Sequence, residues 1–148
     1  MANNRRGHHQ IVADLKEQLR SKGFKILPFP KQEAMIAEIG HDALNPKIKH
    51  TAFRPDIIMS GDEEAQDRFF LEYVHTEKRY VHDLRGMIAL SSMIKKARAF
   101  ILIINDSIYP PHGPLKGVIG EVERMSLSLF RNALNKYSKE VFLRYLEG

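Results

Sequence analysis

Residues 68–76 read RFFLEYVHT, and this stretch decides the fold. Aromatic and β-branched side chains dominate it, which is typical of a β-strand. Because side chains alternate between the two faces of a strand, Glu72 is expected on the same face as Phe70 and Val74. Tyr73 is expected on the opposite face. The strand therefore carries one carboxylate between two apolar neighbours.

The segment before this strand predicts a hairpin. Ile57, Ile58 and Met59 form a short apolar run that ends at Gly61, as a strand bounded by a turn does. Residues 61–67, GDEEAQD, are acidic and are expected to form a solvated turn. Two strands joined by such a turn pair in antiparallel fashion.

The segment after the strand predicts a crossover. Residues 77–98 have the apolar spacing of an amphipathic helix. Residues 99–105, AFILIIN, are apolar without alternation, which fits a strand buried on both faces. A strand–helix–strand connection makes its two strands parallel neighbours. With the hairpin, this gives a mixed sheet with helices on both sides.

The N-terminal part of the chain adds three elements. Residues 9–22 have helical apolar spacing, and Gly23 stands where a glycine ends a helix. A short apolar strand is expected at 24–29 and a second helix at 30–45. The first ten residues, MANNRRGHHQ, are polar and basic and form either a loose arm or the beginning of the helix. His8 and His9 are expected to be solvated, because neighbouring side chains on a helix face different ways.

The C-terminal part is expected to be helical. Residues 106–117 contain three prolines and predict a loop. Residues 118–146 have an apolar face, and the helix is expected to break near Asn135. That face either packs on the sheet of its own chain or forms a dimer interface, and the sequence favours neither.

Composition limits the class of protein. The 148 residues suit one domain, and the absence of cysteine excludes disulfides, thiolate metal sites and a cysteine nucleophile. There is no apolar run of about 18 residues and no signal-like segment, so a cytoplasmic protein is expected. The net charge of +5 is weakly favourable for a nucleic-acid partner. Because the chain has no glycine-rich phosphate-binding motif, a nucleotide-binding domain is disfavoured.

Asp56 and Glu72 are the candidate chemical pair. Asp56 begins one strand of the hairpin and Glu72 lies within the other, so both are set among apolar residues. A buried carboxylate must be paired or bound to a cation, and two converging carboxylates suit Mg²⁺. The alternative is structural: Asp56 caps a turn after Pro55, and Glu72 pairs with Lys78 or Arg54. Spacing alone leaves both interpretations open.

The order helix–strand–strand–strand–helix–strand resembles the PD-(D/E)xK nuclease superfamily, which includes restriction endonucleases and archaeal Holliday junction resolvases. The matching residues are Pro55-Asp56 at the head of one strand and Glu72-Tyr73-Val74 in the next. The resemblance covers about residues 8–106. It implies an α/β fold with a restriction-endonuclease-like αβββαβ core, within one nuclease-like domain spanning 1–148. The C-terminal helices, at about 118–147, have no counterpart in that core.

The resemblance implies a metal-dependent endonuclease that hydrolyses DNA phosphodiester bonds, of the restriction or junction-resolving type. Asp56, Glu72 and the backbone carbonyl of Tyr73 would bind Mg²⁺ or Mn²⁺. A further acid from the first helix is expected, and Glu17 is favoured over Asp14. The bound metal would polarise the scissile phosphate and generate the attacking water.

One position departs from the pattern. The superfamily has a lysine two residues after the glutamate, where this chain has Val74. A cation there stabilises the charge that develops on the phosphate. Lys78 is an even number of residues from Glu72, as side chains on one face of a strand are, and it is the favoured replacement. The alternative is that Lys78 is a solvated charge on the surface of the helix. Without a replacement, the chain would be a catalytically inactive nucleic-acid-binding or assembly protein.

The expected partners are DNA and a second copy of the chain. Enzymes that cut two strands usually act as two-fold symmetric dimers. Basic residues around the motif are expected to hold the DNA backbone without reading its sequence. These contacts are assigned to Lys49, Arg54, Arg79 and Arg85.

Overall fold

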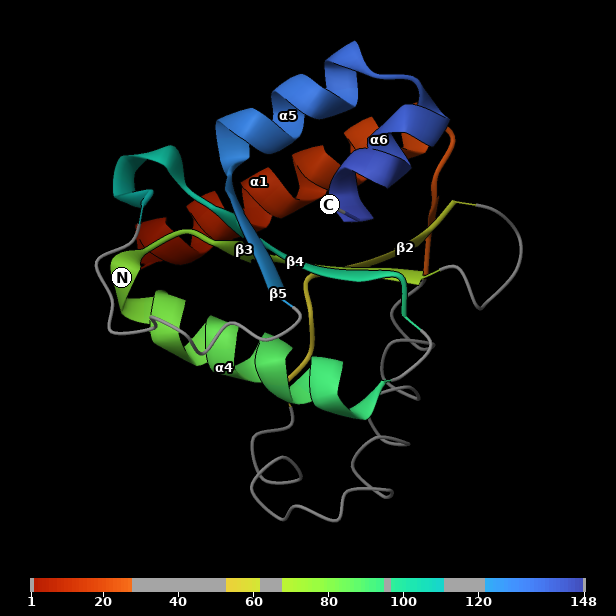
Figure 1. Cartoon of the computed structure of the whole chain (residues 1–148). Helices are drawn as coiled ribbons and strands as arrows, with labels where there is room; N and C mark the ends of the chain where they lie inside the picture. Colours follow the sequence, from red (N-terminus) through yellow and green to blue (C-terminus); the bar gives the residue numbers. More distant parts are fainter. Residues whose placement is uncertain (1, 28–52, 62–67, 95–96, 111–121, 148) are drawn as a thin grey trace.

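The structure is a computed structural model that describes residues 2–27, 53–61, 68–94, 97–110 and 122–147. The described residues form an α/β fold in which helices cover both faces of a five-stranded mixed sheet (Figure 1). The predicted α/β class is therefore confirmed. Several predictions concern residues outside the described ranges: the helix at 30–45, Lys49, the acidic residues 62–67 and the end of the 106–117 loop.

The described elements follow one another along the chain as α1 (Ala2–Ser21), β1 (Lys25–Ile26), β2 (Ile57–Ser60), β3 (Arg68–Val74), α4 (Glu77–Met93), β4 (Ala99–Ile104), a 3₁₀ turn (Asp106–Ile108), β5 (Val122–Ser126), α5 (Leu127–Lys136) and α6 (Lys139–Glu147). The spatial order of the strands is the same as their order in the chain. None of the described helices is long and apolar enough to span a membrane.

The pairing of β3 confirms the hairpin and the crossover. β2 and β3 are antiparallel, with Ile57 opposite Leu71, whereas β3 and β4 are parallel, with Glu72 opposite Leu102. Helix α4 connects these parallel strands. Because Ile57 is the first residue of β2, the register brings the preceding Asp56 to the level of Glu72.

Two hydrophobic clusters lie on opposite faces of the sheet. Helices α1, α5 and α6 cover one face and α4 covers the other (Figure 1). Leu71 and Tyr73 belong to the first cluster, whereas Phe70 and Val74 belong to the second. The predicted alternation along β3 is therefore confirmed.

The N-terminal helix is longer than predicted. Helix α1 begins at Ala2, so the basic N-terminal residues begin the helix and do not form a loose arm. It ends at Ser21, and the expected terminating glycine follows at Gly23, whose φ of 102° is a conformation that side-chain-bearing residues avoid. Strand β1 covers only Lys25–Ile26, and the next N–H, that of Leu27, donates to the carbonyl of Ile58 at 2.9 Å.

The prediction of helix throughout 118–146 is wrong for residues 122–126. Val122–Ser126 forms β5, which pairs with β4 in parallel. Val122 and Met125 are three residues apart and both buried, a spacing that also suits a helix. The strand runs directly into α5 at Leu127, so no turn residues mark its end. The helical break expected near Asn135 is confirmed, because two residues separate α5 from α6.

The C-terminal helices pack on the sheet of their own chain. Phe130, Leu134, Phe142 and Leu146 are almost fully buried in the cluster on the α1 face. Leu129 and Val141 are exposed at the surface of these helices. Most of the predicted apolar face therefore stabilises the fold of the single chain.

Candidate active site

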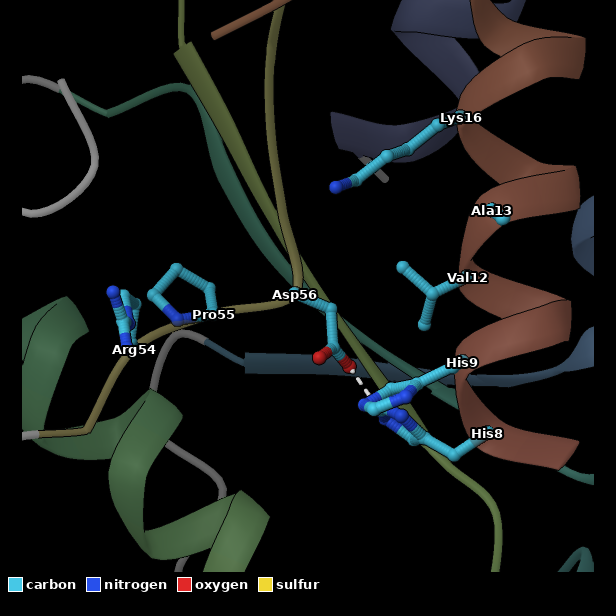
Figure 2. A pocket seen from close by; sticks show the side chains of 8 residues that line it. All are labelled: His8, His9, Val12, Ala13, Lys16, Arg54, Pro55 and Asp56. Atoms are coloured by element: carbon cyan, nitrogen blue, oxygen red, sulfur yellow. Dashed lines mark hydrogen bonds and ion pairs between the residues drawn. The ribbon is translucent and has the colours of Figure 1, made fainter. Parts of the chain in front are cut away.

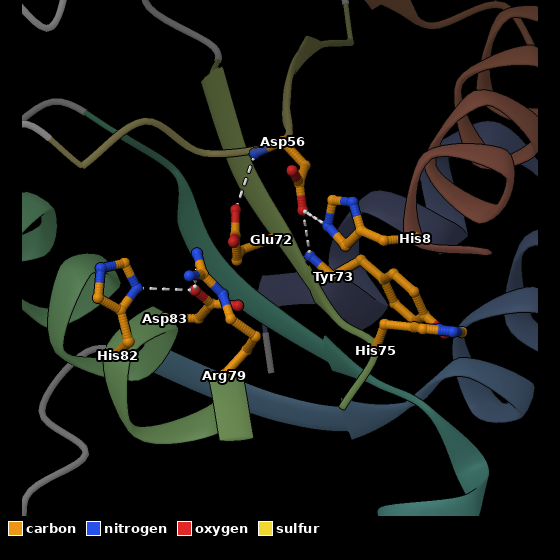
Figure 3. A network of polar contacts seen from close by, with 8 residues as sticks. All are labelled: His8, Asp56, Glu72, Tyr73, His75, Arg79, His82 and Asp83. Atoms are coloured by element: carbon orange, nitrogen blue, oxygen red, sulfur yellow. Dashed lines mark hydrogen bonds and ion pairs between the residues drawn. The ribbon is translucent and has the colours of Figure 1, made fainter. Parts of the chain in front are cut away.

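Asp56 and Glu72 are joined through backbone hydrogen bonds. The N–H of Asp56 donates to Oε1 of Glu72 at 2.9 Å, and the N–H of Tyr73 donates to Oδ2 of Asp56 at 2.8 Å (Figure 3). Each carboxylate thus accepts a bond from the strand that carries the other. The sequence prediction that these two acids lie together is confirmed in its geometry.

The residues before Asp56 are anchored on α4. The ring of Phe53 packs so closely on this helix that a Cβ atom at Gly86 would lie 2.2 Å from Phe53 Cδ1. Pro55, which directly precedes Asp56, is buried. Because the ring of Phe53 occupies the space beside Gly86, the absence of a side chain at Gly86 allows the chain to approach α4 just before Asp56.

Glu72 is buried beside other acids. Its side chain lies within the sheet, and the residue is only 5% exposed. Burial raises the pKa of Glu72 well above its ordinary value, and the negative charges of Asp56 and Asp83 raise it further. Among the described residues, the one contact that favours its charged form is the N–H of Asp56. This carboxyl group therefore either keeps a proton or needs a nearby cation.

Asp83 is a third acid at this place, and the sequence prediction missed it. It comes from α4, is 2% exposed, and contacts His82 Nδ1 at 3.1 Å and Arg79 at 3.4 Å. Burial raises the pKa of Asp83, although His82, Arg79 and a hydrogen bond with Glu72 act in the opposite direction. Its position three residues after the buried Tyr80 was a detectable signal, since it places Asp83 on the buried face of the helix.

His8 supplies a basic neighbour from α1. Its Nε2 lies 3.1 Å from Asp56 Oδ2, and its ring stacks on that of Tyr73 at a centroid distance of 5.6 Å. The hydrogen bond to Asp56 raises the pKa of His8, even though burial alone would lower it. The expectation that His8 is a solvated terminal residue is therefore wrong. Asp56 and Glu72 lie between His8 on one side and Asp83 on the other (Figure 3).

Of the other predicted site residues, some lie near Asp56 and Glu72 and others do not. Arg54 adjoins Asp56, and Arg79 reaches the acids through Asp83. The side chain of Glu17 is 74% exposed and pairs with Arg20, while Asp14 accepts a bond from Gln10. Lys78 and Arg85 are exposed on α4. Among the described contacts, none joins Glu17, Lys78 or Arg85 to Asp56 or Glu72.

The oxygen atoms present fit a hard divalent cation in their chemistry. Mg²⁺ prefers carboxylate and carbonyl oxygens, which Asp56, Glu72 and the Tyr73 backbone provide. The uncompensated burial of Glu72 beside two acids is the kind of environment that a cation relieves. Within the described ranges, no group of three or more His, Asp or Glu side chains is arranged to hold a metal. A cation at Asp56 would also compete with His8 for the same carboxylate.

A pocket of about 460 Å³ adjoins Asp56 (Figure 2). It lies between α1 and the residues that lead into β2. Its lining is His8, His9, Val12, Ala13, Lys16, Arg54, Pro55 and Asp56. Lys16 is the lysine that shares this pocket with Asp56, and the sequence prediction did not single it out.

No family model, curated protein or solved structure matches this chain. The function is therefore inferred from the chemistry of Asp56, Glu72 and their neighbours.

The contact between His8 and Asp56 predicts a pH-dependent contribution to stability. Because the pKa of His8 is raised in the folded state, this contribution is fully present below its ordinary value of 6.5 and is lost as the pH rises through the folded pKa. We expect His8→Gln to lower the free energy of unfolding by up to about 1 kcal/mol at roughly pH 6 and by less at roughly pH 9. Because glutamine retains a hydrogen-bond donor, the difference between the losses at the two pH values reports the charge of the His8 imidazole.

The measurement is chemical denaturation of both proteins across this pH range, without metal. His9→Gln is the matched control, because His9 is the exposed neighbour with no contact to Asp56 among the described residues. An equal loss of stability at both pH values for His8→Gln would contradict the prediction.

Proposed function

We propose that this chain is a metal-dependent endonuclease that hydrolyses DNA phosphodiester bonds, of the restriction or junction-resolving type. The observation that carries the proposal is the buried Glu72, held against Asp56 by reciprocal backbone hydrogen bonds. The order α1–β1–β2–β3–α4–β4 around these acids agrees with the αβββαβ order of the PD-(D/E)xK core. The finer description of the fold as restriction-endonuclease-like is part of the same proposal.

Asp56, Glu72 and the carbonyl of Tyr73 would hold Mg²⁺ or Mn²⁺. When bound, the ion would polarise the scissile phosphate and lower the pKa of a water molecule. The N–H groups of Asp56 and Tyr73 orient the two carboxylates before any ion arrives. Arg54 would bind the DNA backbone beside this site, and Arg79 balances the charge of Asp83.

Two lysines are candidates for the catalytic cation. Val74 cannot serve, and it lies buried in the cluster on the α4 face. Lys78, which the sequence favours, is exposed at the start of α4. Lys16 lines the pocket that Asp56 also lines (Figure 2). Comparison of Lys16→Gln and Lys78→Gln in the cutting assay would distinguish them.

The alternative function is a nucleic-acid-binding or assembly protein that has lost catalysis. Its support is Val74, which stands where the superfamily has a lysine and lies buried in the cluster on the α4 face. It predicts DNA binding that is independent of metal, with no strand cleavage.

Under either function we propose that the protein is cytoplasmic and forms a homodimer. The exposed side chains of Leu129 and Val141 would contribute to the contact between the two copies.

The test is cleavage of supercoiled plasmid with Mg²⁺, with Mn²⁺ and with chelator. We expect metal-dependent nicking or linearisation that the Asp56→Ala, Glu72→Ala double variant reduces at least about 100-fold, because both ligands are lost. Glu123→Ala with Glu140→Ala is the control, since it removes two exposed acids that have no assigned role in the site. If plasmid, flapped and branched DNA all remain intact, the enzyme is excluded and the binding function is favoured.

A further inference from the structure

The pocket beside Asp56 has a wall made by one face of α1. His8, Val12 and Lys16 follow one another at intervals of four residues, as do His9 and Ala13. Residues 54–56 form the opposite wall (Figure 2). The pocket volume of about 460 Å³ falls within the range of roughly 300–1,000 Å³ that is typical of sites for small ligands.

The charges in this pocket favour an anion. Lys16 and Arg54 are both basic, and Asp56 is the one acid among the described residues of the lining. Asp56 Oδ2 already accepts the N–H of Tyr73 and contacts His8, so part of its charge is offset inside the protein. His9 adds an exposed imidazole on the same side as His8. Among the described lining residues, basic side chains therefore outnumber acidic ones.

The uncharged part of the lining restricts what kind of anion fits. Val12, Ala13 and Pro55 are apolar and offer no side-chain hydrogen bonds. A phosphate group carried on a sugar combines a charged end with a less polar body, and it matches this division. Arginine and lysine are also the side chains that bind phosphate most effectively.

We propose that this pocket binds a phosphate group of a nucleic-acid strand, held by the charges of Lys16 and Arg54 with His9 as an additional donor. The choice of nucleic acid as the source rests on the proposed function, but the binding itself needs no metal. The phosphate is either a diester within the strand or a monoester at its end. The experiment below distinguishes these two sources.

The test measures the binding of fluorescently labelled single-stranded oligonucleotides in chelator, so that no cutting occurs. One oligonucleotide ends in a 5′-phosphate and a second, of the same sequence, ends in a 5′-hydroxyl. The Lys16→Gln, Arg54→Gln double variant is compared with Lys136→Gln, Arg144→Gln, which removes two exposed charges from α5 and α6. Far-UV circular dichroism confirms that both variants are folded.

We expect the Lys16→Gln, Arg54→Gln variant to bind the oligonucleotide at least about 10-fold more weakly than the wild type. The slope of its log affinity against log salt concentration should fall by the amount that about two phosphate contacts contribute. The control variant should change affinity less than about 2-fold. A preference of the wild type for the 5′-phosphate that is lost in the double variant identifies a terminal monoester. Equal binding of the two oligonucleotides, with the same loss, identifies a diester.

Affinity and salt dependence that match those of the control variant would overturn the pocket proposal. This outcome is separate from the failure of the endonuclease. If the pocket variant loses binding but the wild type never cuts plasmid, the phosphate site stands and the nuclease falls. If the wild type cuts and the pocket variant binds normally, the nuclease stands and the phosphate site falls.

Discussion

Replacement of Glu72 by glutamine is expected to abolish metal-dependent cutting while making the metal-free protein more stable. Cutting should fall at least about 100-fold, because a neutral amide replaces a carboxylate ligand. The free energy of unfolding at roughly pH 8 should rise by about 1–3 kcal/mol, since a buried carboxyl group beside two acids is removed. Glutamine keeps an oxygen that can accept the N–H of Asp56.

The pH dependence of this gain has a defined sign. The pKa of Glu72 is raised in the folded state, so its contribution to stability is fully present below the ordinary value of 4.5 and is lost as the pH rises through the folded pKa. The glutamine variant has no such loss. Its advantage should therefore grow with pH in the metal-free protein and should shrink when Mg²⁺ or Mn²⁺ stabilises the wild type.

The measurements are thermal unfolding with and without metal, at several pH values, beside the plasmid assay. A gain of 1 kcal/mol corresponds to a rise of about 2–4 °C in Tm for a chain of this size. Glu123→Gln, at an exposed position on β5, is the control and should change neither property. A glutamine variant that cuts normally, or that loses stability at high pH, would exclude the proposed role of Glu72.

The second large effect is expected from Phe130→Ala, which should lower the free energy of unfolding by about 3–5 kcal/mol. Phe130 is fully buried on α5 and packs edge-on against Phe142 of α6 at a centroid distance of 5.4 Å. Removal of its ring leaves a cavity between both C-terminal helices and the sheet. The loss should appear in one cooperative transition, because these helices share a cluster with α1.

Chemical denaturation followed by circular dichroism measures this loss. Leu129→Ala is the matched control on the same helix, since Leu129 is 50% exposed, and it should cost less than about 1 kcal/mol. Similar losses in the two variants, or a separate transition for the C-terminal helices, would show that α5 and α6 are not part of the common core.

Local patterns predicted most of the described core. The alternation in residues 68–76 placed Glu72 and Tyr73 on opposite faces, and a helix between two apolar runs placed β3 beside β4. These predictions succeeded because each depends on neighbouring residues or on one connection. β5 was not predicted as a strand, because five residues are too few to distinguish the two-residue period of a strand from the 3.6-residue period of a helix.

The site was predicted less completely than the fold. Asp56 and Glu72 were found because a hairpin brings them together over a short stretch of chain. His8 lies 48 residues before Asp56, and its contact depends on how α1 packs on the sheet. No local pattern carries that information. Asp83 was missed because its place on the buried face follows from Tyr80, three residues earlier, and not from the spacing that predicted the helix.

The contact between Gly86 and Phe53 has a consequence for how this chain can evolve. Alanine at residue 86 would favour the helix by about 1 kcal/mol, yet its methyl group would displace the ring that anchors the approach to Asp56. Selection for a more stable helix and selection for a working site then act in opposite directions at one position. If the proposed site at Asp56 were no longer under selection, only the packing of Phe53 would still favour glycine at this position.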